Sequence, residues 1–158
     1  MKNEMSEVKA ILSVYVNSMR RFDKLLQRRK ELYDRAIYTS PQFNRTGGKK
    51  NGPPDRFAER LANVDKIDRE LLKIATESNQ QIDDVQNLIN LLYPDFKTML
   101  VLEYRYINGS EWVDIANALD LSLSHVFNVH KTGLKALKEK IDRGDSAKNF
   151  DQPGCESR

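Results

Sequence analysis

The chain has 158 residues and a mass of 18.3 kDa, which is enough for one domain or for a small domain with an extended helical arm. Hydrophobic residues make up 39% and charged residues 31%, with only 5 Pro and 7 Gly, so long segments are free to be helical and an all-α fold is expected. The net charge of +3 excludes neither a nucleic-acid partner nor a protein partner.

Cysteine use and the N-terminal sequence bear on the compartment. Cys155 is the single cysteine, so an intramolecular disulfide is excluded. The segment MKNEMSEVKAILSVYV has acidic residues before a short apolar run and Lys9 within it, which fits neither a signal peptide nor a membrane span. We therefore expect a cytoplasmic protein that does not contact a membrane.

A first long helix is expected from residue 5 to residue 36. Its apolar residues keep a 3,4 spacing, and this period of seven is typical of helices that pack along their whole length. This spacing places one stripe of residues along one side of the helix, which we call its seam. The seam consists of Met5, Val8, Leu12, Tyr15, Met19, Phe22, Leu26, Arg29, Tyr33 and Ala36. It can be buried within one chain or in a homodimeric coiled coil, and Arg29 weakens both arrangements.

A connector and a second long helix follow. Prolines and glycines in residues 39–54 break the helical period and predict a flexible connector. The seam of the next helix, which begins near Asp55, consists of Phe57, Leu61, Val64, Leu71, Ala75, Ile82, Val85, Ile89 and Leu92. Asp68 and Ser78 interrupt it, and the polar residues 79–81 are a place where the helix could bend or break. An antiparallel hairpin of the two helices is the most economical arrangement, and assembly of four chains through the same seams is the alternative.

Residues 94–141 predict three shorter helices. The first begins after Pro94, with an apolar stripe at Phe96, Leu100, Tyr104 and Ile107. Helical spacing then recurs on both sides of a short interruption at residues 120–121, at Val113, Ala116, Leu119, Val126, Val129, Leu134 and Leu137. Ser110 and Ser122 are expected to cap the last two helices, because a serine oxygen can accept one of the unpaired N–H groups at a helix start. This pattern is a helix-turn-helix.

Residues 91–141 resemble region 4 of bacterial sigma-70 factors. The likeness is carried by the Arg-Tyr-Ile-Asn-Gly turn at residues 105–109, the Asp-Ile-Ala run at 114–116, the serine-containing turn, and the leucines at 134 and 137. The stretch is similar in particular to short phage-encoded proteins of Gram-positive hosts that pair such a region with a variable N-terminal helical part. The resemblance implies DNA binding in phage late-gene transcription, in the cytoplasm of a bacterial host cell.

The resemblance also implies which residues contact DNA. The base- and phosphate-contacting positions of the family correspond to Leu123, Ser124, His125, Phe127, Asn128 and Lys131. Asn128 suits a paired contact to adenine and Lys131 a phosphate, while Leu123 and Phe127 suit a thymine methyl group. Sigma factors are rich in arginine at these positions and this chain is not. No counterpart of the sigma domain that opens promoter DNA is found, so a complete sigma factor is not expected.

The charge distribution suggests that the motif needs help to bind DNA. Residues 94–140 carry 6 Lys and Arg against 6 Asp and Glu, whereas residues 1–54 carry 12 against 5. Because phosphate neutralisation supplies much of protein–DNA affinity, help is expected from the basic N-terminal arm, a second subunit or another protein. A candidate phosphate-contacting stripe on the first helix consists of Arg20, Arg21, Lys24 and Arg28. A solvated face paired with Glu31 and Asp34 is the alternative.

No catalytic, metal or cofactor site is expected. The carboxylates are scattered among lysines and arginines, as solubilising charge is, with no accompanying nucleophile. His125 and His130 are five residues apart, so they face different sides of a helix, and no cysteine is near. His130 is expected to pack against or bond a neighbour, and Trp112 and Phe96 are expected in the core.

The sequence thus predicts an all-α, sequence-specific DNA-binding regulator of transcription. Residues 1–92 are expected to form a long-helix hairpin or coiled coil, residues 93–141 a helix-turn-helix domain of the sigma region 4 type, and residues 142–158 a disordered tail. The expected partners are double-stranded DNA, RNA polymerase and a second copy of the chain. Two alternatives remain open: a small terminase-like DNA-packaging subunit, and a protein-interaction module that binds RNA polymerase or a host regulator.

Overall fold

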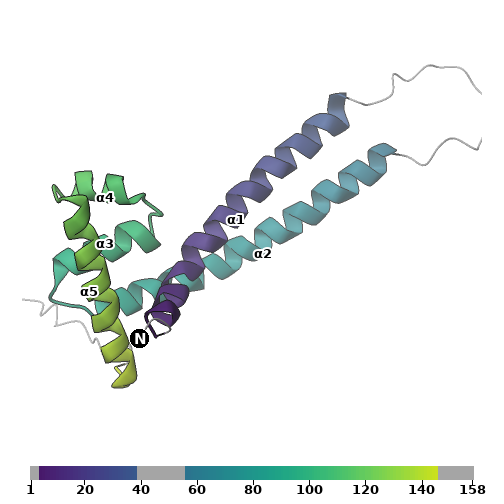
Figure 1. The fold of residues 1–158 in the computed structure, drawn as a ribbon. Helices are drawn as coiled ribbons and strands as arrows, with labels where there is room; N and C mark the ends of the chain where they lie inside the picture. Colours follow the sequence, from purple (N-terminus) through teal and green to yellow (C-terminus); the bar gives the residue numbers. More distant parts are fainter. Residues whose placement is uncertain (1–3, 39–55, 146–158) are drawn as a thin grey trace, which may run out of the picture. The chain divides into compact units, whose positions relative to one another are not determined.

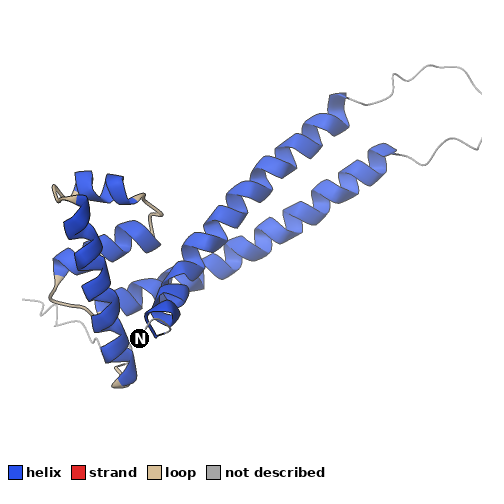
Figure 2. Ribbon diagram, in the orientation of Figure 1, coloured by secondary structure: helices blue, strands red, loops and turns tan. Residues whose placement is uncertain are grey.

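The computed structural model describes residues 4–38 and 56–145, and in these ranges the chain forms five helices and no strand (Figure 1; Figure 2). The helices are α1 (Glu4–Tyr38), α2 (Arg56–Asn90), α3 (Phe96–Tyr106), α4 (Trp112–Ala118) and α5 (Leu123–Asp142). The all-α prediction is confirmed for these residues. Within the same ranges no helix combines the length and the apolar character that crossing a membrane requires. The predicted connector, the start of the second helix at Asp55, the tail beyond residue 145 and Cys155 lie outside the described residues.

The chain divides into two compact units. Among the described residues, the first unit holds 4–17 and 79–145, and the second holds 18–38 and 56–78. Residues on both sides of the domain boundary predicted at residue 93 belong to the first unit. The polar residues 79–81 do not break α2, which is one continuous helix, but the division into units falls beside them.

The first unit has an apolar core shared by the start of α1, the end of α2, α3 and α5. Its buried members are Val8, Leu12, Val85, Ile89, Leu91, Leu92, Leu102, Tyr106, Leu134 and Leu137. A second cluster, Val101, Ile115, Ala116 and Val126, joins α3, α4 and α5, with Trp112 packed against it. Burying apolar side chains is the main favourable contribution to folding, so these two clusters determine how α5 is oriented within the unit.

The predicted apolar stripe of α3 meets the core only through Tyr104 and Ile107, which are half-buried. Phe96 is 61% exposed and Leu100 is 42% exposed, and Phe96 meets Tyr93 edge-on with 5.5 Å between the ring centroids. The buried side of α3 consists of Thr98, Val101, Leu102 and Tyr106. The expectation that Phe96 lies in the core is therefore wrong, whereas Trp112 does pack against core residues as expected.

The second unit pairs a segment of α1 with a segment of α2, and the two run side by side in opposite directions (Figure 1). Its buried apolar residues are Ala36, Val64, Ile67, Leu71 and Ile74. Leu26 and Tyr33 of the predicted seam are 43% and 45% exposed, and Ala75 is exposed as well. The predicted seams thus include three of these five buried residues, but they do not include Ile67 and Ile74.

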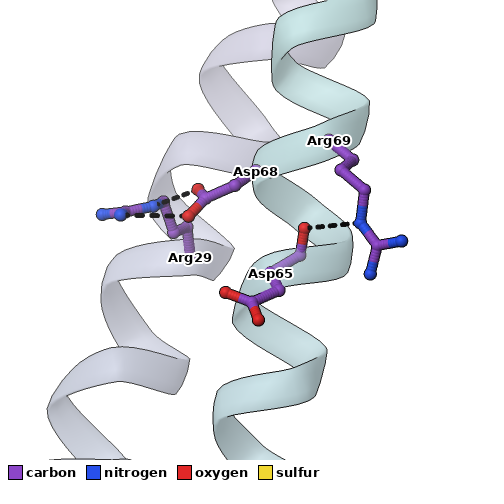
Figure 3. Close-up of polar contacts among 4 residues, drawn as sticks. All are labelled: Arg29, Asp65, Asp68 and Arg69. Atoms are coloured by element: carbon purple, nitrogen blue, oxygen red, sulfur yellow. Dashed lines mark hydrogen bonds and ion pairs between the residues drawn. The ribbon is translucent and has the colours of Figure 1, made fainter.

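Arg29 and Asp68, two of the polar residues in the predicted seams, contact each other. Arg29 donates from Nε and Nη2 to the two carboxylate oxygens of Asp68, with 3.2 Å between Nη2 and Oδ2 (Figure 3). Hydrogen bonding to Asp68 raises the pKa of Arg29. The adjacent Arg69 instead donates to the backbone carbonyl of Asp65 at 3.3 Å (Figure 3). Arg29 and Asp68 therefore form one specific, two-pronged contact between α1 and α2.

Candidate nucleic-acid interface

The corner between α3 and α4 is held by backbone contacts and by Arg105. The N-cap of α4 is Glu111, and its side chain makes no capping hydrogen bond. Gly109, just before Ser110, adopts a φ of 69°. The predicted cap at Ser110 is wrong, because Ser110 precedes the N-cap and its backbone groups bond residues of α3. Its N–H donates to the Tyr104 carbonyl at 2.9 Å, and its own carbonyl accepts from Arg105 Nη1 at 2.9 Å.

Arg105 also connects the corner to the first residue of α4. Its guanidinium carbon lies 4.5 Å from the centroid of the Trp112 ring, and Nη1 lies 3.7 Å from Glu111 Oε2. A guanidinium over an aromatic face is attracted by the ring quadrupole. This arginine belongs to the Arg-Tyr-Ile-Asn-Gly stretch, and its contacts give that stretch a positioning role for α4.

A short turn at residues 119–122 connects α4 to α5. Asp120 adopts the left-handed region with a φ of 51°, which aspartate tolerates better than most residues. The N–H of Leu121 donates to the Ala116 carbonyl at 2.9 Å, which closes the end of α4. Ser122 Oγ accepts the backbone N–H of His125 at 3.2 Å, so the predicted cap at Ser122 is confirmed.

The buried side of α5 carries a histidine in an apolar setting. Tyr106 Oη and His130 Nε2 lie 2.8 Å apart in a hydrogen bond, and the Trp112 ring meets the His130 ring at 4.8 Å between centroids. Burial, followed by the charges of Lys9 and Arg105, lowers the pKa of His130 to about 4. Burial likewise raises the pKa of Tyr106 to about 12. Both groups are therefore neutral at neutral pH, and the expectation that His130 packs against and bonds neighbours is confirmed.

The exposed side of α5 carries all six residues that the family resemblance assigns to DNA contact. They are Leu123, Ser124, His125, Phe127, Asn128 and Lys131, and each is exposed. Ser124, Asn128 and Lys131 follow i, i+4, i+7 spacing, which places them in one row along the helix. The buried residues of α5 are Val126, His130, Gly133, Leu134 and Leu137, on its other side. The row of polar side chains is thus presented by a helix whose back is fixed in the core.

The two apolar members of the set are only partly exposed. Leu123 is 41% exposed and Phe127 is 43% exposed. The Phe127 ring packs against Trp112, with 5.0 Å between the centroids. Phe127 therefore presents one part of its ring to a partner while the other part supports the packing of α4 against α5.

Two further lysines extend this surface, and the sequence reasoning missed both. Lys135 is exposed and follows Lys131 by four residues, so helical spacing alone would have found it. Lys9 of α1 lines the same cavity as Lys131. No local pattern could reveal that proximity, because the two residues are far apart in the sequence.

The basic cluster on α1 belongs to the second unit, so the two groups of candidate DNA contacts lie in different units. Its members Arg20, Arg21, Lys24 and Arg28 are all exposed. Arg21 pairs with Glu70 of α2, not with Glu31 or Asp34, and Glu31 accepts from Gln27 at 3.4 Å. Arg20, Lys24 and Arg28 make no ion pair with any described residue. Three of the four cations are therefore available to a phosphate.

In residues 4–38 and 56–145, no three His, Cys, Asp or Glu side chains lie close enough together to hold a metal ion. Comparison of the chain with protein-family models, with curated proteins and with solved structures gives no match.

Proposed function

We propose that this protein is a sequence-specific DNA-binding regulator of transcription, in which α4, the turn at residues 119–122 and α5 form a helix-turn-helix. The observation that supports the proposal best is the exposed side of α5, where the candidate contact residues follow a capped, tight turn. Apolar packing on α3 and α4 fixes the opposite side. A helix held in this way can enter the major groove of duplex DNA and present its first turns to the base edges.

Each side chain suits a particular part of the duplex. The Asn128 amide can accept from and donate to adenine in a paired contact, and Ser124 and His125 can reach bases or phosphates. Lys131 suits a phosphate. Leu123 and Phe127 offer apolar surface for a thymine methyl group, so the proposal favours a site that contains A·T base pairs.

The rest of the chain is proposed to supply affinity and assembly. In this view the two long helices form a hairpin whose cations Arg20, Lys24 and Arg28 add phosphate contacts, while residues 93–141 act as a domain of the sigma region 4 type. The resemblance favours a role in phage late-gene transcription within a bacterial host cell, with RNA polymerase and a second copy of the chain as further partners.

Binding to duplex DNA tests the proposal. The intact protein is expected to bind one family of related sequences selected from random duplexes, with electrophoretic shifts or fluorescence anisotropy as the readout. Asn128→Ala is expected to weaken the selected site by about 1–3 kcal/mol and to relax the preference at one base pair. Lys131→Ala is expected to weaken all duplexes alike, because a phosphate contact carries no sequence information.

Two exposed residues on other helices serve as matched controls: Asn87→Ala on α2 and Lys97→Ala on α3 should bind like the wild type. The proposal fails if the folded protein binds no duplex at low salt. It also fails if the control variants lose as much affinity as Asn128→Ala and Lys131→Ala.

A protein-interaction module is the second candidate, and a different surface favours it. Tyr93, Phe96 and Leu100 are 53%, 61% and 42% exposed, and large apolar side chains grouped on a surface are typical of protein contacts. The net charge of residues 94–140 is zero, with 6 basic against 6 acidic residues. Capture of purified RNA polymerase without DNA, abolished by Phe96→Ser and unaffected by Asn128→Ala, would favour this candidate.

A further inference from the structure

Two adjoining cavities lie between the first turns of α1 and the exposed side of α5. One has a volume of about 390 Å³ and is lined by Met5, Ser6, Lys9, His130, Lys131 and Leu134. The other has a volume of about 430 Å³ and is lined by Met5, Asn128, Lys131, Thr132 and Lys135. Met5 and Lys131 line both cavities, so the two lie side by side, and together they are called the groove. All of these residues belong to the first unit.

The groove is positively charged, and none of the described residues in its lining carries a carboxylate. Lys9, Lys131 and Lys135 are exposed and make no ion pair with any described residue. Lys138 of α5 differs from these three lysines, because it is paired. Its Nζ lies 3.6 Å from Glu7 Oε2 and 3.0 Å from Asp142 Oδ1. Three unpaired ammonium groups around a hollow attract an anion.

Neutral donors complete the lining. Ser6 and Thr132 offer hydroxyl groups and Asn128 offers an amide, all of which are common partners of phosphate oxygens. His130 adds no charge at neutral pH, because burial and the nearby Lys9 lower its pKa to about 4. The attraction for an anion therefore comes from the lysines and does not depend on histidine protonation.

The position of the groove along α5 indicates where on a duplex it would lie. Ser124 and Lys135 are eleven residues apart, which is about 16 Å along a helix axis at a rise of about 1.5 Å per residue. In a helix-turn-helix the N-terminal residues of the second helix contact the base edges. Lys135 would then lie beyond these contacts, where the sugar–phosphate backbone is the part of the duplex within reach of a lysine.

We propose that the groove between α1 and α5 binds consecutive backbone phosphates of duplex DNA, with Lys9 of α1 acting together with Lys131 and Lys135. This inference rests on the proposed DNA-binding function and extends it. It assigns a contact to Lys9, which the helix-turn-helix pattern does not include. It also makes the start of α1 part of the DNA-binding surface of the first unit.

The salt dependence of binding tests the inference. The variants Lys9→Gln, Lys135→Gln and the double variant are compared with the exposed control Lys97→Gln, using one selected duplex and one unrelated duplex. The slope of the logarithm of the association constant against the logarithm of the salt concentration is negative. Each lost phosphate contact is expected to make this slope shallower by about 0.9, and the double variant should change it by about twice as much. The two duplexes should be affected equally. Thermal unfolding followed by circular dichroism checks that each variant is folded.

The outcomes separate the inference from the function on which it rests. If the wild type binds no DNA, the proposed function is wrong and the inference falls with it. If the wild type binds DNA and Lys9→Gln retains the wild-type slope, only the groove inference is overturned. A loss confined to the selected duplex also overturns it, because that result would indicate a base contact.

Discussion

Gly133 lies on the buried side of α5, where the space for a side chain is already filled. A Cβ at this position would stand 2.4 Å from Thr98 Cγ2 and 3.5 Å from Leu102 Cδ1. Helix propensity alone predicts that Gly133→Ala stabilises the protein by about 1 kcal/mol. Overpacking a filled core costs about 1–3 kcal/mol, and we expect this cost to be the larger effect. The free energy of unfolding, from urea titration, should therefore fall in Gly133→Ala.

Thr98 offers a matched control for that prediction. Its hydroxyl donates to Asp95 Oδ2 at 2.6 Å, and a serine keeps this bond while it lacks the Cγ2 methyl group. The double variant Gly133→Ala, Thr98→Ser should recover most of the stability that Gly133→Ala loses relative to wild type. If Gly133→Ala proves as stable as the wild type, the close approach of α3 to α5 is wrong.

His130 makes stability depend on pH in a defined window. Its pKa is about 4 in the folded protein against an ordinary value of 6.5, so between these values the unfolded chain binds the proton and the folded protein does not. The free energy of unfolding is therefore expected to fall as pH falls, by at most about 2 kcal/mol from neutral pH to about pH 5. His130→Gln should flatten this dependence.

His125 is the natural control, because the chain has only 2 histidines and the side chain of His125 is exposed. His125→Gln should retain the wild-type dependence on pH. An independent readout is the imidazole resonance of His130, which should not titrate above about pH 5. A resonance that titrates near 6.5 would contradict the burial of this side chain.

At the scale of elements, local chemistry predicted the start of α5 but not the start of α4. Ser122 caps α5 as expected, because a capping serine acts on an N–H three residues further along the chain. Ser110 does not cap α4, since its carbonyl is taken by Arg105 and α4 begins one residue later than that cap requires. The start of α4 could not be predicted from local sequence alone, because the corner between α3 and α4 depends on where α3 places the guanidinium of Arg105.

Periodicity likewise predicted the helices better than it predicted their faces. In α5 the buried residues recur with helical spacing on one side. The exposed row of Ser124, Asn128 and Lys131 therefore follows from spacing, although Leu123 and Phe127 are exposed as well. In α3 apolar residues occur on several sides, and the pattern does not say which side a neighbour covers. The spacing predicts that the side with Phe96 and Leu100 is buried, whereas the structure buries the side with Val101.

Part of the candidate interface was therefore predictable and part was not. The six residues on α5 come from one continuous segment, and their exposure needs only an amphipathic helix. Lys9 joins them through packing of Val8 and Leu12 in the core of the first unit, which a heptad pattern cannot specify. The same limit applies to Arg29 and Asp68. Each is a polar residue in an otherwise apolar seam, and only the packing of α1 against α2 shows that the two form a pair.

At the scale of the whole molecule, the two long helices can pair within one chain or between two chains. The seams alone allow both arrangements, because heptad spacing does not identify the partner helix. The contact between Arg29 and Asp68 joins α1 and α2 of the same chain. Polar pairs at otherwise apolar seams often fix register and partner choice, so this contact can be used to distinguish the two arrangements.

Charge exchange at this contact gives the test. Arg29→Asp places two carboxylates opposite each other and Asp68→Arg places two guanidinium groups there, so each single variant is expected to melt at a lower temperature than the wild type. The double variant Arg29→Asp, Asp68→Arg should recover, because the pair is restored within one chain. Lys66→Asp, at an exposed position of α2, controls for the change in net charge.

Mixing the two single variants then separates the arrangements. If the helices close within one chain, a mixture unfolded and refolded together should melt as the two separate proteins do, since neither chain can supply the other's missing partner. If they close between chains, Arg29→Asp chains and Asp68→Arg chains would restore both contacts in a heterodimer, and the mixture would recover the wild-type melting temperature. We expect no recovery in the mixture, and recovery would overturn the hairpin. A hairpin closed within the chain would leave any homodimer to form through other surfaces, because the apolar side of the long helices is already used.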